Sequence, residues 1–195
     1  MLLAGSGAVT GTVPAMTMLR QGLLEGRAVA LAGGVTPAVG EALAALGARV
    51  EELDAALDED SAREWAAGFD GMRALVYDAR EVFGAGGQDA LRQTLERAWV
   101  AARALATGAL IRAGAGKVVL IGPPADAGTF ATAVRAALEN LARTLSVEWA
   151  RFGVGAVAIA PGAHTADDDL AELVCFLVSP AGEYFTGCVF ELGLA

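Results

Sequence analysis

Glycines and one aspartate near the N-terminus have the types and spacing of a nucleotide-binding unit. Residues 27–54 read as a short apolar strand, a glycine-rich turn (GGVTPAVG), a helix and a second strand. In such a unit the free N–H groups at the start of the helix bind a pyrophosphate, and an acidic residue after the second strand binds a ribose hydroxyl. Gly34, Gly40 and Asp54 stand at these places.

The same turn departs from the pattern at its centre. Ala38 stands where the middle glycine of the motif belongs, and Pro37 precedes it. Proline has no N–H to donate, and the alanine methyl keeps the backbone away from a phosphate. We therefore expect Gly34, Gly40 and Asp54 to be vestigial and the chain to bind no dinucleotide cofactor.

Few other residues offer chemistry. His164 is the single histidine, and a lone loop histidine is more often solvated than catalytic. The run 167–169 is three aspartates, which at a helix start complement the helix dipole more often than they bind metal. We expect no metal site, and we expect Cys175 and Cys188 to be reduced thiols in apolar surroundings.

Composition limits the classes of partner. The chain has 195 residues, a net charge of −9, 55% hydrophobic residues and a mean hydropathy of +0.49. Nucleic acid is disfavoured as a partner because phosphate contacts need clustered Lys and Arg. No apolar run is long enough to span a membrane, and the N-terminus lacks the basic start of a signal peptide, so we expect a cytoplasmic protein. The excess apolar surface favours burial against other subunits.

Strands and helices alternate along the rest of the chain. Apolar runs predict strands, and apolar residues at three- and four-residue spacing predict long helices. Such alternation predicts an α/β fold with one doubly wound, Rossmann-type parallel sheet. We expect an N-terminal arm at 1–26 and one domain at 27–195. The further strands are expected at 73–78, 117–121, 155–160 and 188–192, and the helices at 58–67, 88–111, 128–151 and 167–178.

Four stretches together resemble one family. They are LLEGRAVALAGGVTPAVGEALAALGARV, the long helix with RAAL that ends in LSVEW, GVGAVAIAPG, and FLVSPAGEYFTGCVFELG. Over residues 23–193 the chain resembles the short-chain dehydrogenase/reductases. The resemblance implies a Rossmann sheet and assembly through the two long helices and the last strand.

The resemblance also implies a catalytic set that this chain lacks. Counted from LSVE, the family's lysine position is Arg135 and its tyrosine position is Ala131. Pro123 takes the place of the serine, and residues 77–80 read YDAR, so that Arg80 stands where a glycine makes room for the cofactor. A halohydrin-dehalogenase-like site, which has arginine at the lysine position, would still need the serine and the tyrosine. We therefore expect no catalytic residues, and an isolated chain that is not an enzyme.

Two segments are shorter than the resemblance implies. The interval between Asp54 and the next strand holds one helix, so we expect the sheet to be truncated at its third-strand edge. Pro161 and Gly162 are followed almost at once by the helix from Asp167, which leaves no residues for a substrate lid.

These observations favour a non-catalytic subunit. We expect it to assemble with, and support, an active NAD(P)-dependent ketoreductase or alcohol dehydrogenase paralogue, through helices 88–111 and 128–151 and the strand 188–192. Trp99 and Trp149 are the expected anchors of that interface.

Two alternatives stay open. One is an atypical enzyme of lyase or isomerase type, working without nicotinamide in a pocket around Arg80, Arg135, His164 and the aspartates. The other is a ligand-binding regulator.

Overall fold

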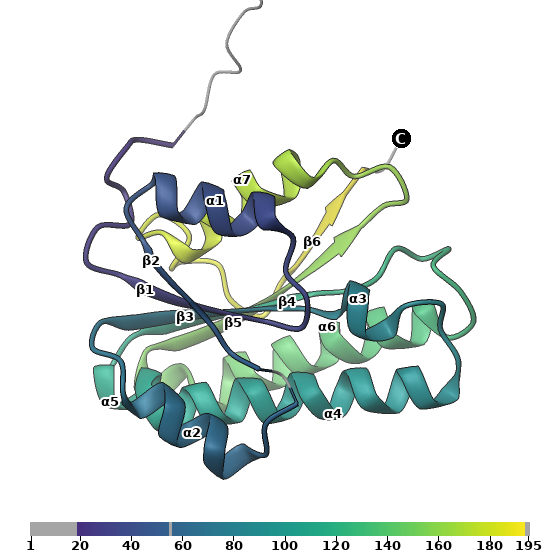
Figure 1. The fold of residues 1–195 in the computed structure, drawn as a ribbon, viewed down its shortest axis with the longest axis horizontal. Coiled ribbons are helices and arrows are strands. Elements are labelled where there is room, and N and C mark those ends of the chain that lie inside the picture. The colour runs from purple at the N-terminus through teal and green to yellow at the C-terminus, as the bar shows by residue number, and fades with distance from the viewer. Residues whose placement is uncertain (1–18, 55, 194–195) are drawn as a thin grey trace, which may run out of the picture.

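A computed structural model describes residues 19–54 and 56–193, which form one six-stranded parallel sheet covered by helices on both faces (Figure 1). The strand order is β2-β1-β3-β4-β5-β6. The strands are β1 Ala28–Ala32, β2 Arg49–Glu52, β3 Met72–Asp78, β4 Gly116–Ile121, β5 Val154–Pro161 and β6 Val189–Leu192. The predicted α/β fold is confirmed.

The central strands are apolar along their whole length because helices cover both of their faces. All five residues of β1 are buried, and β3, β4 and β5 each have a single residue that is not fully buried. β2, at one edge, has no buried residue. No further strand lies outside it among the described residues, so the expected truncation is confirmed.

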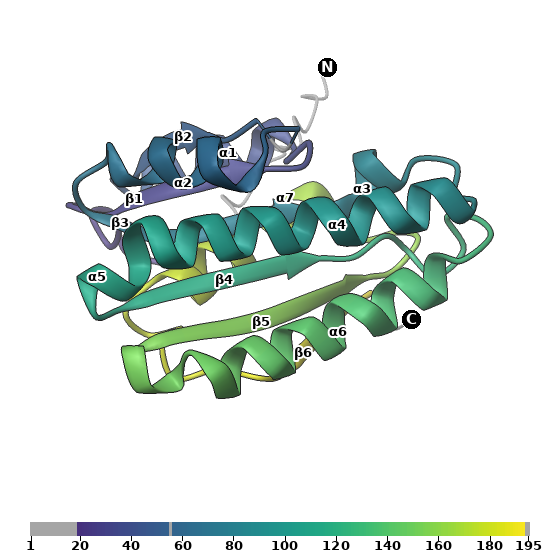
Figure 2. The same ribbon diagram turned by 90° about the horizontal axis from the view of Figure 1, so that it is seen from below.

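The helices form two layers. α1 Pro37–Ala45 and α7 Asp167–Val178 lie on one face, and α2 Glu59–Ala67, α4 Gln88–Leu105 and α6 Ala131–Glu148 lie on the other (Figures 1 and 2). Each face has its own apolar core. Leu43 and Val174 fill the α1–α7 side, whereas Leu105, Leu138 and Leu145 fill the other.

The first long helix contains a π-helical turn. After α4, η1 spans Ala106–Leu110, and α5 Ile111–Ala113 completes the helix. A methyl group at Gly108 would lie 2.7 Å from the carbonyl oxygen of Arg63 on α2. The glycine therefore lets α2 approach this turn closely.

Most boundaries lie within a few residues of the sequence prediction, and three differences have a clear physical cause. α1 begins at Pro37, because proline is well suited to the first turn of a helix. α6 begins at Ala131 rather than 128, since Phe130 has a left-handed conformation (φ 73°) and stands outside the helix. The short helix α3 Ala79–Phe83 was not predicted at all.

The expected arm at 1–26 lies mostly outside the described residues. Of its described part, Leu24 is fully buried and its N–H donates to the carbonyl of Leu46 at the end of α1. No helix of the described chain is long and apolar enough to cross a membrane.

Candidate functional site

The carboxyl ends of β1 and β3 mark the place where a fold of this kind binds ligands. The chain runs from β1 outward to β2 and then returns to the other side of β1 as β3. The crevice beyond these two strand ends is the switch point of the sheet, where ligands of doubly wound folds bind.

Residues at the end of β3 and in α3 pack closely against the glycine turn that follows β1. A methyl group at Gly33 would overlap the carbonyl oxygen of Asp78 and lie 3.2 Å from its carbon. A methyl group at Gly34 would overlap the carboxylate of Glu81 and lie 2.7 Å from its Cβ. Both glycines have positive φ, of 85° and 89°. Their lack of a side chain therefore admits α3, which lies directly on the turn.

The start of α1 also does not suit a pyrophosphate. Pro37 is in its first turn, Thr36 at the N-cap makes no side-chain cap, and no basic residue stands nearby in sequence. The charged group at the turn is the Glu81 carboxylate, which has the same sign as a phosphate. The residues present therefore do not fit a dinucleotide.

The other two candidate cofactor residues have structural roles. Asp54 Oδ1 accepts a hydrogen bond from the Ala56 N–H at 2.8 Å, which makes a local turn after β2. A methyl group at Gly40 would make an ordinary contact of 3.5 Å with Cδ1 of Leu31. Neither position needs a ligand to explain its residue.

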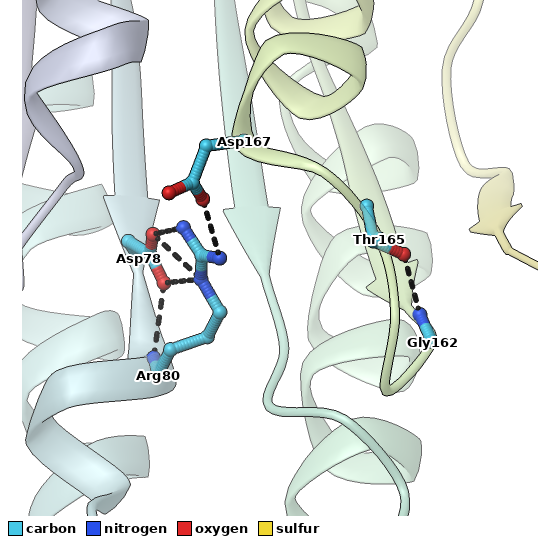
Figure 3. Close-up of polar contacts among 5 residues, drawn as sticks. All are labelled: Asp78, Arg80, Gly162, Thr165 and Asp167. Carbon is cyan, nitrogen blue, oxygen red and sulfur yellow. Dashed lines mark hydrogen bonds and ion pairs between the residues drawn. The ribbon is translucent and has the colours of Figure 1, made fainter.

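A three-residue ion cluster spans the carboxyl edge of the sheet (Figure 3). Arg80 Nη2 lies 2.8 Å from Oδ2 of Asp78, and Nε lies 3.1 Å from both oxygens of that carboxylate. Arg80 Nη1 lies 3.2 Å from Oδ1 of Asp167, the first residue of α7. Burial raises the pKa of Asp78, and the hydrogen bonds and charge of Arg80 act against that rise.

The short loop after β5 is held by its own hydrogen bonds. Thr165 Oγ1 accepts from the Gly162 N–H at 2.9 Å (Figure 3) and also donates to the Leu192 carbonyl at 3.3 Å. Only residues 162–166 separate β5 from α7, so the expected absence of a lid in this segment is confirmed.

Arg135, at the position of the family's lysine, makes hydrogen bonds to backbone carbonyl groups. Arg135 Nη1 donates to the carbonyls of Pro123 at 3.1 Å and Pro161 at 2.7 Å. Ala131, at the tyrosine position, is buried. Arg135 therefore joins the loop after β4 to the end of β5.

Lys117 was not singled out as a site residue by the sequence, and it is buried. It begins the buried part of β4, and its Nζ donates to the carbonyls of Glu183, at 3.3 Å, and of Phe185. Burial lowers its pKa. The signal in the sequence was that this single lysine directly precedes an apolar strand.

His164 lines a cavity on the other side of the 162–166 loop. The cavity has a volume of about 690 Å³, with Leu23, Leu173 and Phe176 among its apolar lining residues and Asp169 among its charged ones. Arg80 and Arg135 do not line it. Within 19–54 and 56–193, no three His, Cys, Asp or Glu side chains are grouped as metal ligands, and both cysteines are free thiols.

Comparison with known proteins gives the class of fold. No family model and no curated protein matches the chain. Among solved structures, a citronellol catabolism dehydrogenase of Pseudomonas aeruginosa PAO1 is 20% identical with a TM-score of 0.74, covering 90% of this chain and 97% of that one. A putative NAD(P)-dependent gluconate 5-dehydrogenase of Beutenbergia cavernae with bound NADP is 22% identical (TM-score 0.72, 86% and 95% covered). A mutant Serratia marcescens short-chain dehydrogenase/reductase is 21% identical (TM-score 0.70, 86% and 96% covered).

The chain thus has the fold of the short-chain dehydrogenase/reductases. The comparison also corrects one expectation. The sequence analysis predicted that the isolated chain is not an enzyme, but the solved structures that share its fold over most of their length are dehydrogenases and reductases. That prediction is wrong on this finding.

Proposed function

We propose that this chain is one subunit of an oxidoreductase, assembled with a short-chain dehydrogenase/reductase paralogue that carries the family's tyrosine–lysine pair. The observation that supports the proposal most directly is the exposure of Trp99 in the middle of α4. Its side chain is 41% exposed, and the Arg103 guanidinium lies 5.8 Å from the ring centroid. Tryptophan and arginine are the residues most enriched at the centres of protein interfaces.

Both long helices carry an exposed large apolar residue. α4 and α6 each have 18 residues and lie on the same face of the sheet (Figures 1 and 2). Val147 on α6 is 77% exposed. Each helix is about 27 Å long at 1.5 Å per residue, which suits a paired-helix contact of standard size.

Fewer apolar residues of α6 are available for an interface than its sequence suggests. Leu138 and Leu145 are buried on the chain's own sheet, and Trp149 is half-buried against the same core. Trp149 is therefore a weaker candidate for the interface than Trp99. The outer side of β6, the second edge of the sheet, is the place for the additional contact through the last strand.

Co-expression tests the proposal. The chain is produced with a short-chain dehydrogenase/reductase paralogue encoded beside it, and native mass spectrometry and NAD(P)-dependent turnover are measured. We expect a mixed assembly whose turnover exceeds that of the paralogue alone by about tenfold, equivalent to about 1.4 kcal/mol. Separate homo-oligomers of the two chains, with unchanged turnover, would contradict it.

The His164 cavity supports a second candidate function, catalysis without nicotinamide on a largely apolar molecule. Its volume falls in the range of small-molecule sites, and an apolar wall with a few convergent polar groups is typical of them. The test follows the His164 imidazole resonances by NMR during a screen of small organic acids and alcohols. A compound that shifts them in the wild type, and not in Leu173→Arg, favours this function, and no shift with any compound counts against it.

A further inference from the structure

The crevice at the switch point of the sheet has an occupant within the chain. We infer that α3 closes this crevice permanently, and that Glu81 and Arg80 join the loops that a bound ligand would otherwise bridge. This inference does not depend on the proposed assembly. It follows from three sets of contacts around α3.

The first set joins α3 to the turn after β1. The Glu81 side chain lies so close to Gly34 that even a methyl group there would overlap it. The carbonyl of Asp78 occupies the corresponding place at Gly33. Two successive glycines with positive φ are thus used for the close approach of the end of β3 and of α3 to the turn.

The second set joins α3 to the start of α7. Asp78 caps α3 by accepting a hydrogen bond from the Arg80 N–H at 3.0 Å, and the Arg80 side chain folds back onto the same carboxylate. From there Nη1 reaches Asp167, 87 residues away in the sequence (Figure 3). One guanidinium therefore links β3 to α7 across the edge of the sheet.

The third set fixes the segment that follows α3. Gly86 forms a parallel bridge with Thr129, and the Gly87 N–H donates to the Thr129 carbonyl at 3.2 Å. A methyl group at Gly128 would lie 3.2 Å from the carbonyl carbon of Ala85. Both ends of α3 are thereby anchored, so the short helix cannot swing away from the crevice as a hinged lid would.

The inference predicts loops that are ordered without a ligand and indifferent to nicotinamide cofactors. Hydrogen exchange measured by mass spectrometry on the full chain tests this, with NADH and NADPH each added in excess. We expect the amides of 33–40 and 162–170 to exchange at the same rate with and without either cofactor. Protection of residues 33–40 by NADH or NADPH would overturn the inference.

A matched pair of variants tests the link to α7. Asp167→Asn removes the charge of the Arg80 partner on α7, whereas Asp168→Asn makes the same change one residue further along the same helix turn. We expect exchange in 162–170 to rise about tenfold in Asp167→Asn and not in Asp168→Asn, because a charge-assisted contact that holds the loop is lost only in the first. Both carboxylates are exposed, so both variants should fold. Equal exchange in the two variants would overturn the inference.

Discussion

Asp78 and Arg80 form an ion pair across the first turn of α3, in which the carboxylate has no exposed surface and receives three side-chain contacts of 2.8 to 3.1 Å from the guanidinium. Burial alone would favour a neutral carboxyl group. The pair therefore makes the stability of this edge of the sheet depend on a single arginine.

Replacing Arg80 should destabilise the fold. Arg80→Met leaves the Asp78 carboxylate buried without its counter-ion, which costs about 3 kcal/mol in the free energy of unfolding. Urea denaturation measures it. Arg92→Met is the control, since the carboxylates near Arg92 are exposed and 3.9 Å away, and it should change the free energy by less than about 0.5 kcal/mol. Equal effects in the two variants would show that Asp78 does not need Arg80.

Two glycines of the turn and of α1 should respond in opposite ways to alanine. Gly33→Ala places a methyl group against the Asp78 carbonyl at a φ of 85°, and should cost about 2 kcal/mol or more. Gly40 lies inside α1, where a methyl group would make an ordinary van der Waals contact of 3.5 Å with Cδ1 of Leu31. Gly40→Ala should therefore stabilise the helix by about 0.5–1 kcal/mol. Thermal and urea unfolding of both variants measures these changes. A destabilised Gly40→Ala would mean that this glycine has a role beyond packing.

Lys117 should make stability rise toward alkaline pH. Burial lowers its pKa below the ordinary 10.5, so between the lowered pKa and 10.5 the unfolded chain binds more protons than the folded one. Stability therefore increases as pH rises through this window. Tyr77 works in the opposite direction above pH 10, because burial raises its pKa.

A comparison with Lys117→Met isolates that effect, because Tyr77 is present in both proteins. Urea unfolding from neutral pH to pH 10 should show the wild type gaining stability relative to the variant as pH rises. A constant difference between the two proteins over this range would mean that Lys117 stays charged in the fold.

Sequence periodicity sufficed for most of the fold, because the long elements carry a strong apolar pattern. α7 was predicted at its observed bounds, since three aspartates start it and a serine follows its last apolar turn. α3 could not be predicted in the same way. Its five residues are too few for a helical period, and their conformation depends on the Asp78 cap and on packing against Gly33 and Gly34.

The site was harder to predict than the fold. The sequence analysis singled out Arg80, but not its contact with Asp167, which lies 87 residues away and is brought close only by the fold. Arg135, which the sequence analysis placed at the family's lysine position, donates to two backbone carbonyls. Every residue has a backbone carbonyl group, so no sequence pattern could identify which ones accept these hydrogen bonds.

The measurement that tests the proposed assembly most directly is the mass of the co-expressed complex when its interface carries a new charge. Trp99→Glu places a carboxylate at the centre of the α4 surface, where burial without a partner costs several kcal/mol. Tyr184→Glu is the matched control, an aromatic that is 90% exposed on the loop before β6. Size-exclusion chromatography with light scattering should show a dissociated complex for Trp99→Glu, with circular dichroism unchanged, and an intact complex for Tyr184→Glu. A full-mass complex with Trp99→Glu would contradict the account.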